Sequence, residues 1–147
     1  MEKAISDDYA SLYPVLDGVR LKWHIDYWDG PISGIAEFDN RLSYFSQCDS
    51  RVKIDPDSGE IARELPGRWR RRFLLYELTE EELNEELHWH QLFQESVGTH
   101  TDYDESGNRN LDGVRDDPAK RDAFYKAYQQ RPPTDFSNNK IIGWFQR

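Results

Sequence analysis

Apolar and polar side chains alternate along the first part of the chain. Between Val19 and Trp28 this period of two indicates a half-buried strand. Its apolar side is predicted to carry Leu21, Trp23, Ile25 and Tyr27. The following Asp29-Gly30-Pro31 should end the strand, because proline cannot donate to a sheet and glycine tolerates positive φ.

Two further strands are predicted to follow directly. The segments Ser33 to Phe38 and Arg41 to Gln47 flank Asp39-Asn40, and both turn residues tolerate left-handed conformations. This spacing is typical of a two-residue hairpin. The first three strands should therefore form an antiparallel meander, with the aromatic side chains of the first stretch on one of its faces.

The remaining strand predictions come from three separate segments. Arg51 to Asp55 and Glu60 to Glu64 flank PDSG, a common turn composition, and would form a hairpin. Arg71 to Leu78 carries apolar residues on both faces, which favours an inner strand covered on two sides. Ile141 to Phe145 is apolar enough to be a last strand.

A long helix is predicted from Glu80 to Val97. Thr79 and Glu82 have the spacing of a capping box, and Gly98 is a typical residue just beyond a helix end. At about 100° per residue, one apolar stripe forms along this helix. It contains Leu83, Leu87, His90, Phe93 and Val97, with Trp89 at its border.

A shorter helix should begin at Pro118, capped by Asp116 or Asp117, and run to about Gln130. Its expected inner face carries Ala123, Phe124, Ala127 and Tyr128. The chain is thus predicted to be one globular α+β domain over residues 1–147. Its antiparallel β-meander would have four to five strands, with the long amphipathic helix packed on a face and the shorter helix beside it.

Composition supports a folded protein. Only 37% of the 147 residues are hydrophobic, but the chain has five Trp, eight Tyr and seven Phe, and disordered chains are poor in such residues. No apolar run approaches the roughly 20 residues that cross a bilayer. The single cysteine, Cys48, cannot form an intrachain disulfide. No secretory signal is visible in the first residues, so we expect a cytoplasmic protein that does not contact membrane.

The net charge of -9 is unevenly distributed. Between Glu77 and Asp117 there are thirteen acidic residues and two arginines. An acidic surface of this kind favours a basic partner, or serves only solubility.

The helical His90 is the first candidate for chemistry. Glu86 lies one turn earlier, so its carboxylate is positioned to accept from the imidazole, and the pair could act as a general base with its orienting group. The alternative is a histidine at the edge of the core that Glu86 satisfies. His88 is roughly 200° away on the helix, so the HWH triplet is not a joint metal site.

His100 and Asp102 follow the long helix and could fold back toward Glu86 or His90. Histidines with carboxylates can bind a metal, but neither HExxH nor a calcium-loop motif is present. We therefore expect a polar loop, no metal and no cofactor.

Other groups give less specific signals. Cys48 could act as a nucleophile with His24 or His100, although a lone cysteine usually serves as packing. Carboxylates that cluster around the first bend could pair for acid–base work, but exposed turn residues are the simpler interpretation. They are Asp26, Asp29, Glu37 and Asp39.

The segment GRWRRR combines arginines with an aromatic ring, as nucleic-acid sites do. Its candidate patch is Arg68, Arg70 and Arg72. Because the segment is short and the chain acidic, we expect these arginines to pair with the acidic helix or loop, and no nucleic-acid partner.

Two function classes follow. The preferred hypothesis is a non-enzymatic interaction protein, such as a toxin-neutralising immunity protein or a phage-encoded inhibitor, that binds a basic protein. The candidate partner-binding residues are the acidic Glu81, Glu85, Asp104 and Glu105, with the aromatic anchors Trp28, Trp89 and Tyr103. The alternative is a small enzyme or ligand-binding domain whose helix–sheet pocket uses Glu86, His90 and His100. The interaction protein is preferred because it needs only features that are present, whereas no P-loop, GxGxxG or GxSxG motif supports an enzyme.

Overall fold

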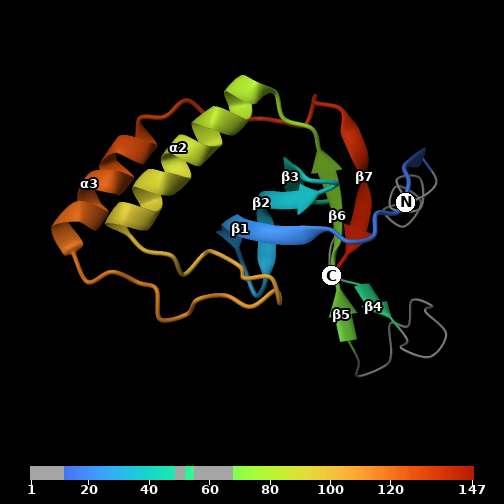
Figure 1. Cartoon of the computed structure of the whole chain (residues 1–147), viewed down its shortest axis with the longest axis horizontal. Helices are drawn as coiled ribbons and strands as arrows, with labels where there is room; N and C mark the ends of the chain where they lie inside the picture. The colour runs from blue at the N-terminus through green and yellow to red at the C-terminus, as the bar shows by residue number, and fades with distance from the viewer. Residues whose placement is uncertain (1–11, 49–51, 55–67) are drawn as a thin grey trace.

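A five-stranded antiparallel sheet and two helices form the body of the protein (Figure 1). The computed structural model describes residues 12–48, 52–54 and 68–147. The sheet has the order β1-β2-β3-β6-β7, with the bounds Arg20–Tyr27, Pro31–Phe38, Arg41–Gln47, Arg72–Tyr76 and Ile141–Gln146. The helices α2 (Glu80–Ser96) and α3 (Pro118–Gln129) lie side by side on one side of it. The predicted α+β fold is confirmed.

The β2–β3 hairpin forms where the turn residues predict it. Asp39 and Asn40 have φ values of 54° and 62°, and Phe38 pairs with Arg41 across the turn. Both turn residues are therefore left-handed, as a two-residue hairpin that follows the twist of the strands requires.

A second, two-stranded sheet contains one strand of another predicted hairpin. The strand β4 (Val52–Ile54) pairs with β5 (Arg68–Arg70), a pairing that the sequence pattern did not predict. The predicted hairpin partner of the first segment, Glu60 to Glu64, lies outside the described residues.

An irregularity in the pairing of β1 changes which side chains face the helices. Leu21 pairs with Ala36 of β2 and Trp23 pairs with Ile35, so two residues advance on β1 for one on β2. This is the pattern of a β-bulge, which reverses the direction of the side chains beyond it. Leu21 and Trp23 consequently lie in different hydrophobic clusters, and the prediction that they share a face is wrong.

The two clusters occupy opposite faces of the sheet. One contains Leu21, Ala36, Phe45, Phe73, Leu75, Tyr103 and Phe145. The other contains Trp23, Ile35, Leu78 and Phe136, with Leu83 of α2 packed against it. In β6, the consecutive residues from Phe73 to Leu75 are all buried, which confirms the predicted inner strand with two covered faces.

The bend between β1 and β2 is held by a buried arginine. Arg71 donates to the carbonyl oxygens of Trp28 (2.5 Å), Asp29 (2.9 Å) and Pro31 (3.1 Å). Arg71 is 7% exposed, whereas the Trp28 beside it is 74% exposed. The expectation that this arginine pairs with the acidic helix or loop is wrong, because backbone carbonyls of the bend receive its hydrogen bonds instead.

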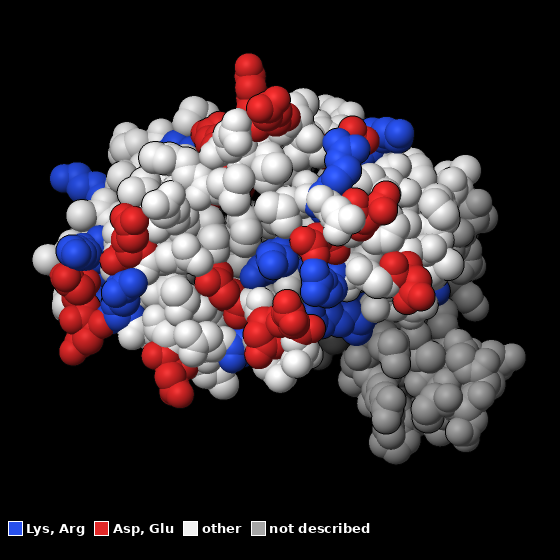
Figure 2. All heavy atoms as spheres, in the orientation of Figure 1, with Lys and Arg blue, Asp and Glu red and all other residues white. Residues whose placement is uncertain are grey.

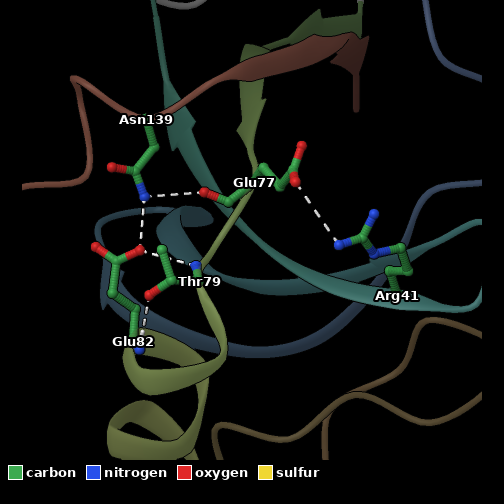
Figure 3. A network of polar contacts seen from close by, with 5 residues as sticks. All are labelled: Arg41, Glu77, Thr79, Glu82 and Asn139. Carbon is green, nitrogen blue, oxygen red and sulfur yellow. Dashed lines mark hydrogen bonds and ion pairs between the residues drawn. The ribbon is translucent and has the colours of Figure 1, made fainter.

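The start of α2 is fixed by a capping box (Figure 3). The Thr79 hydroxyl accepts from the Glu82 backbone at 3.1 Å, and the Glu82 carboxylate accepts from the Thr79 backbone at 2.9 Å. Asn139, just before β7, donates to the same carboxylate and to the Glu77 carbonyl, both at 2.9 Å. The helix is thereby tied to the end of the sheet.

The inner face of α2 differs from the predicted stripe. Glu86 is the buried residue within the helix, whereas Leu87 is 38% exposed. The buried Val97 caps the helix, and Gly98 follows with a φ of 145°. Neither α2 nor α3 is long and apolar enough to cross a membrane. Leu83, His90, Phe93 and Val97 lie inward as predicted, so the stripe is wrong at Leu87, and Glu86 is buried instead.

Candidate functional site

A cavity of about 440 Å³ lies between the sheet and the two helices. The first half of the sheet contributes Trp23, His24, Asp26, Ser33 and Tyr44. The helix α2 contributes Glu86, Trp89, His90 and Phe93, and the segment after it contributes His100 and Thr101. Phe124, Tyr125 and Tyr128 come from α3, with Arg131 and Thr134 beyond its end.

A buried ion pair joins the two helices at this cavity. The Arg131 guanidinium, just past α3, donates to the Glu86 carboxylate of α2. The two side chains are 6% and 4% exposed. Glu85 brings a second carboxylate oxygen to 3.4 Å from Arg131 Nε. A buried charge needs such a partner, because an unpaired one costs several kcal/mol.

Aromatic rings complete the surroundings of Arg131. Its guanidinium lies 5.8 Å from the Trp89 ring centre and 5.7 Å from that of Tyr128. Burial by itself would lower the pKa of Arg131, but the hydrogen bond and charge of Glu86 raise it above its ordinary value. Arg131 is therefore a fixed positive charge held by carboxylates and rings.

His90 lies in a sandwich of rings with a carboxylate at its edge. Its imidazole stacks on Trp23 at 3.9 Å between ring centres, with 5° between the planes, and on Phe93 at 6.5 Å. Nε2 lies 2.7 Å from Oδ1 of Asp102, although that oxygen accepts no aligned hydrogen bond. The contact is therefore a close approach of the imidazole to the carboxylate rather than a directed hydrogen bond.

The predicted partner of His90 is thus corrected. Glu86 lies one turn away on the same helix, but its carboxylate binds Arg131. Asp102 occupies the position at His90 instead, and Gln94 donates to its other oxygen at 2.7 Å. Asp102 thus folds back to His90, which is one of the two positions that the sequence left open for it and not the simple polar loop that was expected.

The segment after α2 reaches the site because it lies along the edge of β1. Thr101 accepts from the His24 backbone at 3.1 Å, and Tyr103 donates its backbone NH to Lys22 at 2.9 Å. These bonds place Asp102 opposite Trp23. One short stretch of backbone pairing therefore positions both the ring and the carboxylate that contact His90.

Two other histidines beside the cavity remain uncharged at neutral pH. Burial, followed by the positive charge of Arg109, lowers the pKa of His24 to about 4. The same two causes, in the same order, lower the pKa of His100. His24 Nδ1 lies 3.1 Å from the Tyr103 hydroxyl, and His100 Nδ1 is buried without a hydrogen-bond partner.

The cavity can therefore bind and orient a ligand and can accept a proton. It combines neutral imidazoles, a carboxylate-paired histidine and aromatic faces, and an imidazole within reach of a substrate proton can act as a general base. In the part of the chain that the structure describes, no cluster of three or more His, Cys, Asp or Glu could hold a metal ion.

The structure gathers the three predicted catalytic candidates, Glu86, His90 and His100, around one cavity. The predicted aromatic anchors are instead dispersed. Trp89 lines the cavity, and Trp28 is exposed at its bend. Tyr103 is 9% exposed, so its expected exposure is wrong: β1 pairing places its ring in the core.

The acidic candidates are distributed over the surface. Glu81 and Glu105 are exposed, and the Asp104 carboxylate accepts from two backbone NH groups of its own turn. On the face shown in Figure 2, basic side chains lie among the acidic ones. That face therefore does not present a uniform negative field.

The arginine segment is divided between two sheets. Arg68 and Arg70 bound β5, and Arg72 begins β6 after a break at Arg71. The Arg72 guanidinium lies 5.4 Å from the Trp144 ring centre.

Sequence reasoning missed two parts of the site. The sequence pattern places Tyr128 on the inner face of the shorter helix without a role in a site. It assigns no role to Arg131, which follows the predicted end of that helix. The signal that could have found Arg131 is Glu86: a glutamate among inward-facing positions needs a cation, and Arg131 follows the other amphipathic helix.

In comparisons with protein-family models, curated proteins and solved structures, nothing matches this chain. The interpretation of the site therefore depends on its geometry.

The lowered pKa of His24 predicts a pH-dependent stability. The unfolded chain binds a proton near pH 6.5 but the folded protein binds it only near pH 4, so stability falls as the pH falls through that window. The loss from this residue should approach about 3 kcal/mol. Urea unfolding of the wild type and of His24→Gln, from pH 7 to 4.5, measures it. The exposed His88→Gln is the control, and equal slopes in the wild type and His24→Gln would contradict the assignment.

Proposed function

We propose that this protein binds a small organic molecule in the cavity between β1 and the two helices. The observation that carries the proposal is the cavity itself, whose volume of about 440 Å³ falls within the roughly 300–1,000 Å³ typical of ligand pockets. A core that served only stability would close such a space, because protein interiors pack densely.

The kinds of residue around the cavity also support ligand binding. Rings from four elements (β1, β3, α2 and α3) offer flat apolar surface, and a few polar groups converge among them, as in most small-molecule sites. The buried Glu86–Arg131 pair adds to this argument. For stability alone, apolar residues of similar volume would often serve equally well or better.

A molecule bound beside His90 could transfer a proton to its imidazole. Asp102 approaches Nε2 of this histidine, and neutral His100 lies at the same cavity. Ligand binding is the proposed function, and proton transfer by His90 is the chemistry that the same arrangement would add.

Fluorine NMR of fluorotryptophan-labelled protein tests ligand binding. The probes are soluble aromatic amines, amides, alcohols and carboxylates. We expect some of them to shift the Trp23 and Trp89 resonances saturably, with dissociation constants of about 1 mM or tighter. Trp28 and Trp144 do not line the cavity and serve as internal references.

A variant that fills the cavity provides the control. Ser33 lines the cavity and is 4% exposed, so Ser33→Leu should place its larger side chain there and abolish the shifts. Its circular dichroism must match that of the wild type. A probe set that leaves Trp23 and Trp89 unchanged, or moves the Trp28 and Trp144 resonances as much as those of Trp23 and Trp89, would contradict the proposed pocket.

The second candidate function is the interaction protein with a basic partner. The observation that favours it is Trp28, which is 74% exposed on a bend that Arg71 holds by three hydrogen bonds. A rigid, exposed tryptophan is the kind of residue that anchors a protein interface.

Capture from a native-host lysate at low salt tests the second candidate. One variant is Trp28→Ala, and another reverses the charges of Glu81, Glu85, Asp104 and Glu105. We expect each variant to weaken capture of the same basic protein, because aromatic burial and charge attraction both contribute to binding such a partner. Capture that survives both changes would exclude this function.

A further inference from the structure

The charge and the rings around the cavity indicate what kind of molecule it accepts. Building on the proposed ligand-binding function, we propose that the ligand is an organic cation: an amine or quaternary ammonium group on a compact carbon skeleton. The argument depends on which charges at the cavity are already compensated and which are not.

Asp26 is the carboxylate at the cavity that has no cationic partner among the described residues. It lines the cavity, and its contact is with the Ser33 hydroxyl, which donates to Oδ2 at 3.2 Å. The second register shift of β1 lies between His24 and Asp26 and brings Asp26 opposite Ser33. The backbone therefore directs a negative charge to the cavity without neutralising it.

Arg131 cannot offset this charge or attract an anion. Its guanidinium is bound by Glu86 and approached at 3.4 Å by Glu85, so two carboxylates surround one cation. Arg109 lies 4.4 Å from the Tyr27 ring centre and is not among the lining residues. Among the lining residues, the formal charge of Asp26, Glu86 and Arg131 together is negative.

The aromatic rings favour a cation as well. The face of an aromatic ring carries partial negative charge and attracts ammonium and guanidinium groups within about 6 Å. Trp89 and Tyr128 already accept the guanidinium of Arg131 in this way. A carboxylate beside several rings is the combination that recognises substituted ammonium ions in proteins.

Two histidines at the cavity, His24 and His100, do not offset its negative charge. His24 and His100 are uncharged at neutral pH, because burial and Arg109 lower the pKa of both. An anionic ligand would meet the negative charges of Asp26 and Glu86 while the lining cation Arg131 is already bound by Glu86, whereas a cationic ligand would be attracted by Asp26.

Calorimetry with three probes of similar size tests the inference. Benzyltrimethylammonium is the cation, N,N-dimethylbenzamide the neutral probe and phenylacetate the anion. We expect the cation to bind at least about tenfold more tightly than either of the others, because ring faces and a carboxylate both attract a positive charge. The Trp23 and Trp89 resonances should shift on its binding.

A matched pair of variants locates the charge effect. Asp26→Asn retains the shape and the contact with Ser33, and it should weaken binding of the cation about fivefold. Asp122→Asn removes one charge from a side chain that is 79% exposed and does not line the cavity, so it should change affinity less than twofold.

The outcomes separate this inference from the proposed function. If the neutral or anionic probe binds as tightly as the cation, or if Asp26→Asn leaves the affinity for the cation unchanged, the inference is overturned and the pocket remains. If benzyltrimethylammonium shifts neither Trp23 nor Trp89, the inference is overturned too. The proposed function fails only if the whole fragment set leaves both resonances unchanged.

Discussion

The contact between Glu86 and Arg131 determines how the two helices sit over the sheet. Both charges are withdrawn from water, so each must remain beside the other, and Arg131 follows directly on α3 while Glu86 lies within α2. This requirement holds the end of α3 against α2. With the helices joined, their rings face the sheet across a space of about 440 Å³. The position of the end of α3, and with it the side of the cavity that Arg131 lines, depends on this pair, while ring contacts such as that of Trp89 with Phe124 join the helices as well.

Two register shifts in β1 determine which of its side chains face the helices. The first turns Trp23 away from the cluster of Leu21, so that its ring stacks on His90. The second brings Asp26 opposite Ser33. Bulges often occur beside functional sites because they redirect single side chains. Backbone pairing of Thr101 and Tyr103 with the same strand then supplies Asp102. A single irregular edge strand thus positions most of the polar groups that face the helices.

Features determined by neighbouring residues could be predicted from the sequence. The capping box at Thr79, the left-handed Asp39-Asn40 turn and the ends of both helices depend on contacts within a few positions. The bulges could not be predicted, because the alternation of Val19 to Trp28 is equally consistent with a regular strand. The partner of Glu86 lies 45 positions away, and local spacing favoured His90 instead. Glu86, His90 and His100 could be named as site residues, but their partners depended on how the chain folds over long distances.

A double-mutant cycle between Glu86→Gln and Arg131→Gln tests the central claim most directly. The free energies of unfolding of the wild type, both single variants and the double variant give the coupling between the two side chains. If the buried pair holds α3 on α2, each single change leaves an uncompensated charge, and the coupling should reach about 2 kcal/mol or more. A coupling below about 0.5 kcal/mol would show that the two charges do not depend on each other, and it would contradict the account.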